Sequence, residues 1–361
     1  MQTFGNAPVA QKSRSRSERK AGAPAVTLKQ IALKAGLNIS TVSRALAGAY
    51  GVNGSTRKKV LALAAKLDYR PNLMARGLVT GRAQTIGLLI SDIRNPFFAE
   101  LARGAEEAAR SAGHDLILCN SDIDPKKQWD YFRSLREKRV SGIIMNSVSG
   151  LSQSQRNELA HSEVPIVLLN PPQQPLEGCS TITADNLTGG ELAASYLIGL
   201  GHRHIAHLTG RRQHGNFRLR LEGFQRAARA APAGVTTVVL AGDHNFNGGY
   251  QLTWKLLARQ PEVTAIFAAN DIMAFGALRA LTERGTRVPE DVSLLGFDNI
   301  ELASVVTPRL TTIHQPKWEM GRAAVEMLIR HEKMGPGAPA ENLVLDVALV
   351  EGKSCARIDR P

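Results

Sequence analysis

Polar residues that could bind a small molecule stand directly after several short apolar runs. TIGLLIS, SGIIM and VSLLGF each lead into Asp or Asn. If these runs are parallel strands, their carboxyl ends share one edge of a sheet, which is where open α/β proteins bind their ligands. Carboxylates and amides there can bond to the hydroxyl groups of a polar ligand. The candidates by position are Asp92, Asn95, Asn146, Asn170, Asn270 and Asp298.

An ordinary structural role competes with ligand binding at some of these positions. Asn and Asp at strand ends often accept hydrogen bonds from backbone amides of the following loop or helix. For Asn146 and Asn270 this cap or turn role is as strong an interpretation as ligand binding. Asp298 is a firmer candidate, because a carboxylate can accept hydrogen bonds from two vicinal hydroxyls at once.

Signatures of catalysis and of metal binding are missing from the sequence. The chain contains no Walker-type phosphate loop, no nucleophile elbow and no His/Cys spacing typical of a metal site. His202, His204 and His207 lie together in GHRHIAHL, but the first two are only two residues apart on a predicted strand without carboxylates nearby. We therefore expect neither an enzyme nor a metal site, and no cofactor.

Positive charge is concentrated at one end of the chain. Residues 1–82 contain 15 Lys and Arg against 2 acids, which accounts for the whole net charge of +13 and leaves the remainder neutral. Binding a polyanion releases its condensed counterions, so a basic module joined to a neutral one indicates nucleic acid as partner of the first. A tail that only aids solubility explains residues 12–20, but not a patterned segment that stays basic to Arg82.

Length and composition limit the architecture and the compartment. A chain of 361 residues favours two or three domains. Residues 1–25 are rich in Ser, Arg, Ala and Pro and are predicted to form a disordered basic arm. They lack the apolar segment of a secretory signal, and no stretch is long enough to cross a bilayer, so a cytoplasmic protein is expected. The three cysteines are far apart and are expected to be free thiols.

Residues 26–70 show the pattern of three short amphipathic helices. Thr27 opens a capping-box pattern before a helix that stops at a glycine. Asn38 can cap a second helix over 39–47, and Asn53 can cap a third with apolar residues at helical spacing. Two short helices joined by a tight turn and backed by a third predict an all-α helix-turn-helix domain.

In a helix-turn-helix, the second helix lies in the major groove with its first residues at the base edges. Ile39 can then meet a thymine methyl, Ser40 faces the bases, and Arg44 can contact guanine in a bidentate manner worth roughly 1–3 kcal/mol. A solvated charge on the helix face is the alternative for Arg44. The other candidates for DNA contact, chiefly to phosphates, are Thr27, Leu28, Thr41, Ser43, Arg57 and Lys58.

Longer motifs connect the two modules to one family. VTLKQIALKAGLNISTVSRALAG, TRKKVLALAAKLDYRPN, LMARGL and TIGLLISDIRNPFFAEL resemble the lactose-repressor/galactose-repressor (LacI/GalR) family, and matching patterns cover residues 26–355. The resemblance implies a transcriptional regulator, most simply a repressor, that binds a pseudo-palindromic operator as a homodimer near the nucleoid. It also makes Ile39 and Ser40 the variable base-contacting pair. Ala47 departs from the family's usual Asn, which puts one backbone contact in doubt.

Residues 71–83 carry features of a conditional helix. A proline suits the first turn and a glycine weakens the end, so the segment alone is a marginal helix. The family resemblance implies a hinge helix that folds on DNA, followed by a linker. Leu78 matches the residue that wedges into the minor groove, with Asn72 and Arg76 as further DNA contacts. Packing against the next domain is the alternative role for Leu78.

Residues 84–361 alternate apolar runs with helical stretches, which predicts parallel sheets covered on both faces. The segment is long enough for two sheets, and a switch between them is indicated near Asp185, where TADNLTGG leads into a helix. The resemblance implies an α/β domain of the periplasmic-binding-protein type (type I), with return crossings near 314–316 and 342–345. The expected N-subdomain covers about 84–184 and 316–343, and the expected C-subdomain about 185–315 and 344–361.

The same resemblance adds residues to the predicted ligand site. They are Phe97, Phe98, His214, Asn216, Arg220 and His244. The Arg220 fork can bind vicinal hydroxyls and an aromatic ring can stack on a sugar face, so the resemblance implies a carbohydrate-derived effector. Asn170-Pro171 replaces the Asp-Arg of many members, which weakens the transfer of a particular ligand identity from the family.

The expected mechanism is linkage between the ligand cleft and the DNA-binding segment through the hinge. A bound effector would change the angle of the subdomains and thereby decide whether two hinge helices form together. The sequence does not distinguish an inducer from a corepressor. A secreted solute receptor would need an export signal, and an architectural DNA-binding protein would leave the cleft unexplained. The segment EGKSCARIDRP has no leucine heptad, so a dimer is expected rather than a coiled-coil tetramer.

Overall fold

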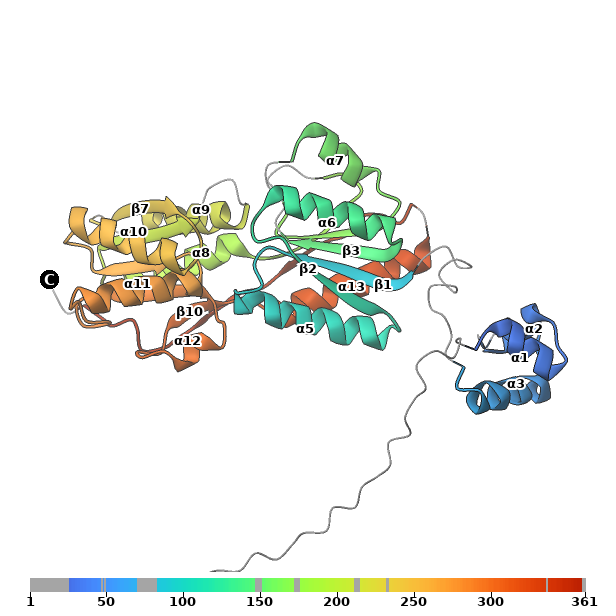
Figure 1. The fold of residues 1–361 in the computed structure, drawn as a ribbon. Helices are drawn as coiled ribbons and strands as arrows, with labels where there is room; N and C mark the ends of the chain where they lie inside the picture. The colour runs from blue at the N-terminus through green and yellow to red at the C-terminus, as the bar shows by residue number, and fades with distance from the viewer. Residues whose placement is uncertain are drawn as a thin grey trace, which may run out of the picture. The chain divides into compact units, whose positions relative to one another are not determined.

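Figure 1 shows the computed structural model, in which the chain divides into two compact units, Met1–Arg76 and Gly77–Pro361. The expected arm over 1–25 lies outside the described residues, as do 70–82 and therefore all of the expected hinge except Ala83. The structure describes residues 26–46, 48, 50–69, 83–146, 151–171, 176–210, 215–231, 234–335 and 337–358.

Three short helices form the first unit: α1 (Leu28–Ala35), α2 (Ile39–Leu46) and α3 (Gly54–Lys66). The capping box predicted before α1 is formed, because Thr27 Oγ1 accepts from the Gln30 amide and Gln30 Oε1 accepts from the Thr27 amide at 2.9 Å. Helix α2 is described as far as Leu46, and Ala47, its predicted last residue, lies outside the described residues. Apolar side chains from all three helices make the core: Ile31, Ala32, Val42, Ala45, Val60 and Ala64.

The second unit contains two sheets, and the first has strand order β11-β5-β4-β3-β1-β2 with all strands parallel. Its strands are β1 (Ala83–Ile90), β2 (Asp115–Asn120), β3 (Val140–Asn146), β4 (Ile166–Leu169), β5 (Ser180–Ala184) and β11 (Asn342–Leu345). Its helices are α5 (Pro96–Ser111), α6 (Pro125–Glu137), α7 (Gln153–Ala160) and α13 (Lys317–Met334). In Figure 1, α5 and α13 lie on one face and α6 on the other, so the central strand β3 is buried throughout. We call this part the first lobe.

The second sheet has strand order β12-β10-β9-β8-β6-β7, and only β12 runs antiparallel to its neighbour. Its strands are β6 (His204–Gly210), β7 (Thr236–Gly242), β8 (Ala265–Ala268), β9 (Ser293–Asp298), β10 (Thr311–His314) and β12 (Ala348–Val350). Its helices are α8 (Asn186–Gly199), α9 (Gly215–Ala230), α10 (Phe246–Arg259), α11 (Asp271–Glu283) and α12 (Leu302–Val305). This part is the second lobe.

The chain passes between the lobes at three places, after β5, after β10 and after β11. The predicted subdomain boundary between residues 343 and 344 lies too early, because β11 continues in the first sheet to Leu345 before the chain makes its last passage. At the other end, β1 begins at Ala83, which was assigned to the linker. An isolated short strand carries no periodicity that would mark its ends, which is why such boundaries are missed by a residue or two.

Helix α13 is fixed to the first lobe by unusually close packing against α5. A Cβ on Gly321 would lie 2.0 Å from the Leu101 carbonyl oxygen, and a Cβ on Gly104 would lie 2.0 Å from the Trp318 carbonyl oxygen. Only glycine permits this approach of two backbones. The helix that follows the second passage therefore moves with α5.

In the part of the chain that the structure describes, no helix is both long and apolar enough to span a bilayer. The described cysteines are all free thiols.

Candidate effector cleft and DNA-contacting helix

A cavity of about 660 Å³ lies between the two lobes, with walls from the carboxyl ends of strands in both sheets. Eleven of the twelve predicted effector residues line it, and the twelfth, His214, lies outside the described residues. Six of the eleven, from Asp92 to Asp298, were chosen for their place at strand ends, and the other five were implied by the family resemblance. The lining residues that were predicted are Asp92, Asn95, Phe97, Phe98, Asn146, Asn170, Asn216, Arg220, His244, Asn270 and Asp298.

Arg220 is held rigidly at the second-lobe side of the cavity. Its side chain is 2% exposed, Nε donates to Asn186 Oδ1 at 2.8 Å, and Nη1 donates to the Ala269 carbonyl at 2.5 Å. The guanidinium also lies over the Phe297 ring, with Cζ 3.6 Å from the ring centre. Burial lowers the Arg220 pKa to about 10, opposed by nearby carboxylates, so the side chain is a fixed cation at neutral pH.

Asp298 is the buried carboxylate opposite this cation. Arg220 Nη1 lies 3.8 Å from its Oδ1, and Gln315 Nε2 donates to the same oxygen at 2.5 Å. Burial raises the Asp298 pKa to about 6, while Arg220 and Lys317 act in the opposite direction. The carboxylate is therefore mainly ionised near pH 7 and protonates in mild acid.

Gln315 was missed as a candidate in the sequence analysis. It lines the cavity and is 1% exposed, and its Oε1 has no hydrogen-bond partner among the described residues. A buried amide oxygen without a donor is costly, so a ligand donor at this position would be favourable. The available signal was its place directly after the short strand TTIH at an expected crossing, just as Asp298 stands at the end of its strand.

A row of amides forms the first-lobe side of the cavity. Asn170 Nδ2 donates to Asn146 Oδ1 at 3.1 Å, and Asn146 Nδ2 donates to Ser91 Oγ at 2.8 Å. Asn170 has a φ of 53°, in the left-handed region that Asn tolerates better than most residues. The remaining amide and hydroxyl donors and acceptors of this row can bond to polar groups of a ligand.

Three of the predicted polar residues have structural partners as well as a place in the cavity wall. Asn95 Oδ1 caps α5 by accepting from the Phe97 amide, and Asn270 Oδ1 caps α11 by accepting from the Met273 amide at 2.7 Å. The Asp92 carboxylate accepts both Nε and Nη2 of Arg94, at 2.8 and 3.0 Å. The cap interpretation thus describes Asn270 well, whereas Asn146 caps none of the helices that the structure describes.

Aromatic rings from both lobes complete the walls. Phe97 and Phe98 meet edge to face with centroids 5.1 Å apart, and His244 lies 5.1 Å from the Phe217 ring. Phe217 and Phe246 were not predicted, although Phe217 follows the predicted Asn216 in α9 and Phe246 begins α10 shortly after the predicted His244. Phe246 is 47% exposed at the cavity wall, which suits a surface that a ligand covers.

The histidines of GHRHIAHL are structural. His202 bonds to Thr264 Oγ1 and Ser293 Oγ at 3.0 and 2.9 Å, and His207 stacks on Phe267 with centroids 4.5 Å apart. Burial lowers the pKa of both imidazoles to about 4, so both are neutral at pH 7. The described residues contain no group of three or more His, Cys, Asp or Glu side chains arranged to hold a metal ion.

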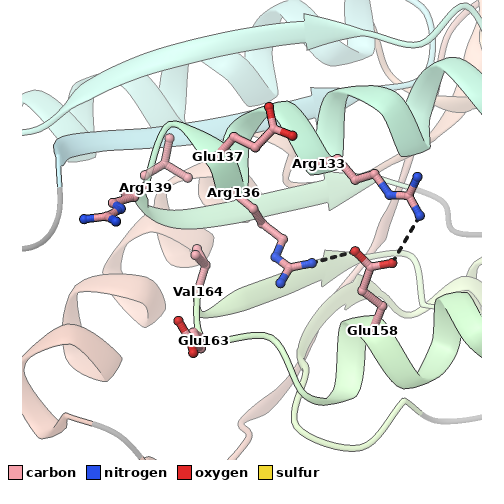
Figure 2. A pocket seen from close by; sticks show the side chains of 8 residues that line it. Arg133, Arg136, Glu137, Arg139, Glu158, Glu163 and Val164 are labelled. Atoms are coloured by element: carbon pink, nitrogen blue, oxygen red, sulfur yellow. Dashed lines mark hydrogen bonds and ion pairs between the residues drawn. The ribbon is translucent and has the colours of Figure 1, made fainter.

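A second cavity, of about 610 Å³, lies on the first lobe. Figure 2 shows Arg133 and Arg136 of α6 pointing toward Glu158 of α7, which Arg136 contacts at 2.6 Å and Arg133 at 3.6 Å. The lining contains three arginines and three glutamates, whose charges balance, and no aromatic side chain. The cleft between the lobes is the better ligand site.

The first unit presents its predicted base-contacting residues to solvent. Ile39 is 45% exposed, and Ser40 in the first turn of α2 and Arg44 in its last turn are also exposed. Arg44 Nε donates to the Ser40 carbonyl at 3.3 Å, so the guanidinium rests along its own helix. An apolar residue and a cation exposed on one short helix match the requirements of major-groove contact.

The remaining predicted DNA contacts of this unit differ in their surroundings. Ser43 and Lys58 are exposed, whereas Leu28, Thr41 and Arg57 are half-buried. Thr27 is exposed, although its hydroxyl already caps α1. Asn72, Arg76 and Leu78 lie outside the described residues.

Comparison with known proteins agrees with both units. Residues 27–72 match the model of bacterial regulatory proteins of the lacI family, and residues 194–355 match a periplasmic binding protein-like domain. The ribose operon repressor of Escherichia coli (strain K12) is 37% identical over 327 residues, covering 90% of this chain and 98% of that protein. Among solved structures, the Lac repressor dimer bound to operator and the anti-inducer ONPF matches with a TM-score of 0.80 and 31% identity, covering 92% of this chain and 100% of that chain.

A LacI family transcriptional regulator from Enterococcus faecium, solved with bound ribose, matches the ligand-binding part. Its TM-score is 0.68 at 35% identity, covering 76% of this chain and 100% of that chain. With the family models, these matches define a DNA-binding transcriptional regulator and not an enzyme. The chain belongs to the LacI family, and the predicted combination of a helix-turn-helix domain with a two-sheet periplasmic-binding-protein-like domain is confirmed.

Proposed function

We propose that this regulator binds a pseudo-palindromic operator as a homodimer and that a small neutral sugar in the inter-lobe cleft controls its operator affinity. The buried Arg220–Asp298 pair at the cavity wall carries the proposal. A fixed cation and a carboxylate 3.8 Å apart offer donors and an acceptor to adjacent hydroxyls, which is the geometry of a polyol site. A relative named the ribose operon repressor and a relative solved with bound ribose make a pentose the first choice.

The charges of the cavity favour a neutral effector. Its Asp and Arg side chains form two pairs of opposite sign, Asp92 with Arg94 at 2.8 Å and Arg220 with Asp298 at 3.8 Å. A sugar phosphate or sugar acid would have to break one pair to find a cation, and desolvating an unpaired anion is expensive. Hydroxyl groups can bond to both pairs without separating them.

Each side of the cleft has a separate proposed role. Arg220, Asp298 and Gln315 bind hydroxyls from the second lobe, and the Asn146–Asn170 row binds them from the first. Aromatic residues pack on the apolar face of the sugar ring. A ligand that needs contacts from both lobes favours the closed arrangement, which is how binding energy becomes a change of shape. The other proposed effector contacts are Asp92, Asn95, Phe97, Phe98, His214, Asn216, His244 and Asn270.

On the DNA side, Ile39, Ser40 and Arg44 are the proposed base contacts. Thr27, Leu28, Thr41, Ser43, Arg57 and Lys58 are proposed to contact the phosphate backbone. We further propose that residues 71–83 supply the hinge, with Asn72, Arg76 and Leu78 meeting the operator centre. A regulator of this kind works in the cytoplasm at the nucleoid.

A thermal-shift screen tests the proposed effector class. The panel contains D-ribose, other neutral aldoses, ribose 5-phosphate and hypoxanthine, and positives are measured again by calorimetry. A ligand at one hundred times its dissociation constant stabilises the binding fold by about 2.7 kcal/mol. The proposal expects a shift with a neutral pentose and none with its phosphate. A shift confined to the phosphate or to the purine would contradict the assignment of the cavity.

A further inference from the structure

Lys317 is a buried lysine placed directly behind the effector cleft. It is the first residue of α13 and is 2% exposed, but it does not line the cavity. Its ammonium donates to three backbone carbonyls, those of Asp298 at 2.8 Å, Asn299 at 2.9 Å and Gln315 at 3.3 Å. Two of these residues line the cleft, so the ammonium contacts the backbone of the effector site rather than the effector.

The backbone that Lys317 binds is strained. Asp298 has a φ of 119° and Asn299 a φ of 51°, both in the region that residues other than glycine rarely adopt. Such a conformation persists only where its surroundings determine it. Here Asp271 supports the far side of the turn, because its carboxylate accepts from the Ile300 amide at 2.9 Å.

On the first-lobe side, the same ammonium lies near a carboxylate of α5. Helix α13 packs on α5 at the close glycine contacts described above, and Glu100 of α5 places Oε2 3.9 Å from Lys317 Nζ. Lys317 therefore joins the strained end of β9, in the second lobe, to two helices that are fixed on the first lobe. It does so at the passage between β10 and α13, where the lobes must rotate if the cleft closes.

We propose that Lys317 is a positioning residue that couples occupation of the cleft to the relative orientation of the lobes. This inference rests on the proposed function, because it assigns a transmission role to the backbone of the same effector site. A ligand bonded to Asp298 would shift the Asp298–Asn299 turn, whose carbonyls accept hydrogen bonds from the buried Lys317 ammonium. Leaving that ammonium without acceptors is costly, so the turn and α13 shift together. The two lobes thereby respond to a contact made by only one of them.

The test compares Lys317→Met with Lys333→Met in the full chain. Methionine preserves the length and apolar stem of lysine and removes only the ammonium. Lys333 lies in the last turn of the same helix and is exposed, which makes it the matched control. Fluorophores at Asp130 of α6 and Arg229 of α9, both exposed, report the inter-lobe distance by single-molecule energy transfer.

Without any effector, Lys317→Met is expected to broaden the inter-lobe distance distribution by about twofold, since the passage then permits several orientations. Lys333→Met is expected to reproduce the wild-type distribution. A Lys317→Met protein that melts at a lower temperature but keeps the wild-type distribution would overturn the proposal, because the lysine would then be stabilising only. Should that variant not fold, Glu100→Gln replaces it, and an unchanged distribution in Glu100→Gln overturns the proposal equally.

A second arm measures D-ribose binding and operator affinity in the same variants. If the wild type responds to D-ribose, Lys317→Met is expected to reduce the change in operator affinity at least about fivefold while D-ribose still binds. Retained coupling in that variant contradicts the proposal. A wild type that ignores D-ribose contradicts the proposed effector, whereas the effector-free distance measurement still decides the role of Lys317.

Discussion

The guanidinium carbon of Arg220 lies 3.6 Å from the centre of the Phe297 ring, and Phe297 directly precedes Asp298 in β9. One strand end thus supports the cation with an aromatic face and supplies the carboxylate that lies 3.8 Å from it. The two groups assigned to the effector's hydroxyls are positioned by packing before a ligand arrives. Preorganisation of this kind lowers the cost of binding.

Arg220→Lys is expected to weaken effector binding about a hundredfold, which is roughly 2.7 kcal/mol. A lysine cannot donate to Asn186 and to the Ala269 carbonyl while also facing Asp298, because it lacks the planar fork. Isothermal titration calorimetry with the effector measures the loss. Arg218→Lys is the control, since Arg218 stands two residues away and pairs with Glu222. Equal affinities of wild type and Arg220→Lys would remove Arg220 from the site.

Effector binding is expected to weaken in mild acid. A ligand hydroxyl donates to the ionised Asp298, so binding lowers the pKa of that carboxyl below its free value of about 6 and competes with protonation. Affinity is then flat above pH 7 and falls by up to about tenfold per pH unit below 6. Calorimetry between pH 5 and pH 8 measures this dependence.

Asp298→Asn separates this effect from other titrations. The neutral amide cannot change charge, so the variant is expected to bind more weakly at neutral pH and to show no decline toward pH 5. The exposed Asp291 pairs with Arg287, and Asp291→Asn serves as the control that keeps the wild-type profile. A wild-type profile in Asp298→Asn would assign the titration to another group.

Arg44→Ala is expected to remove preference for the operator while salt-sensitive binding to DNA remains. The side chain is exposed on α2, and a bidentate guanine contact is worth roughly 1–3 kcal/mol of discrimination. Competition between an operator selected from random DNA and a scrambled duplex, at several salt concentrations, measures the operator preference and the salt dependence. Lys66→Ala removes the same charge from the end of α3 and is expected to preserve the specificity ratio. Unchanged discrimination in Arg44→Ala would leave Arg44 as a solvated charge.

Gly321→Ala is expected to destabilise the first lobe by about 1–3 kcal/mol, because the added methyl meets the backbone of α5 and not a flexible side chain. Its Cβ would lie 2.0 Å from the Leu101 carbonyl oxygen. Thermal unfolding measures the effect. Gly199→Ala adds a methyl at the end of α8 where nothing lies within 4 Å, and its melting temperature is expected to stay near that of the wild type. Equal stability of the two variants would show that α5 and α13 can separate without cost.

The strand-end pattern in the sequence was sufficient to predict much of the cleft. Parallel strands place their carboxyl ends together, so Asn146 and Asp298 could be assigned to one site without knowing any contact. Gln315 was missed because its strand, TTIH, has only four residues and three of them are polar. The burial of Lys317 could not be predicted, since a lysine in a first helical turn is normally exposed. Burial of a cation by backbone carbonyls depends on the tertiary structure and leaves no sequence signal.

Effector binding in the cleft and operator binding are expected to change each other's affinity by the same factor. Operator affinity of the wild type, on a site selected from random DNA, is measured with and without D-ribose, and D-ribose affinity is measured with and without that operator. Both ratios are expected to be equal and to lie between about 5 and 150, with a ratio near one in Asp298→Asn. D-ribose binding that leaves operator affinity unchanged in the wild type would contradict the claim that the cleft controls DNA binding.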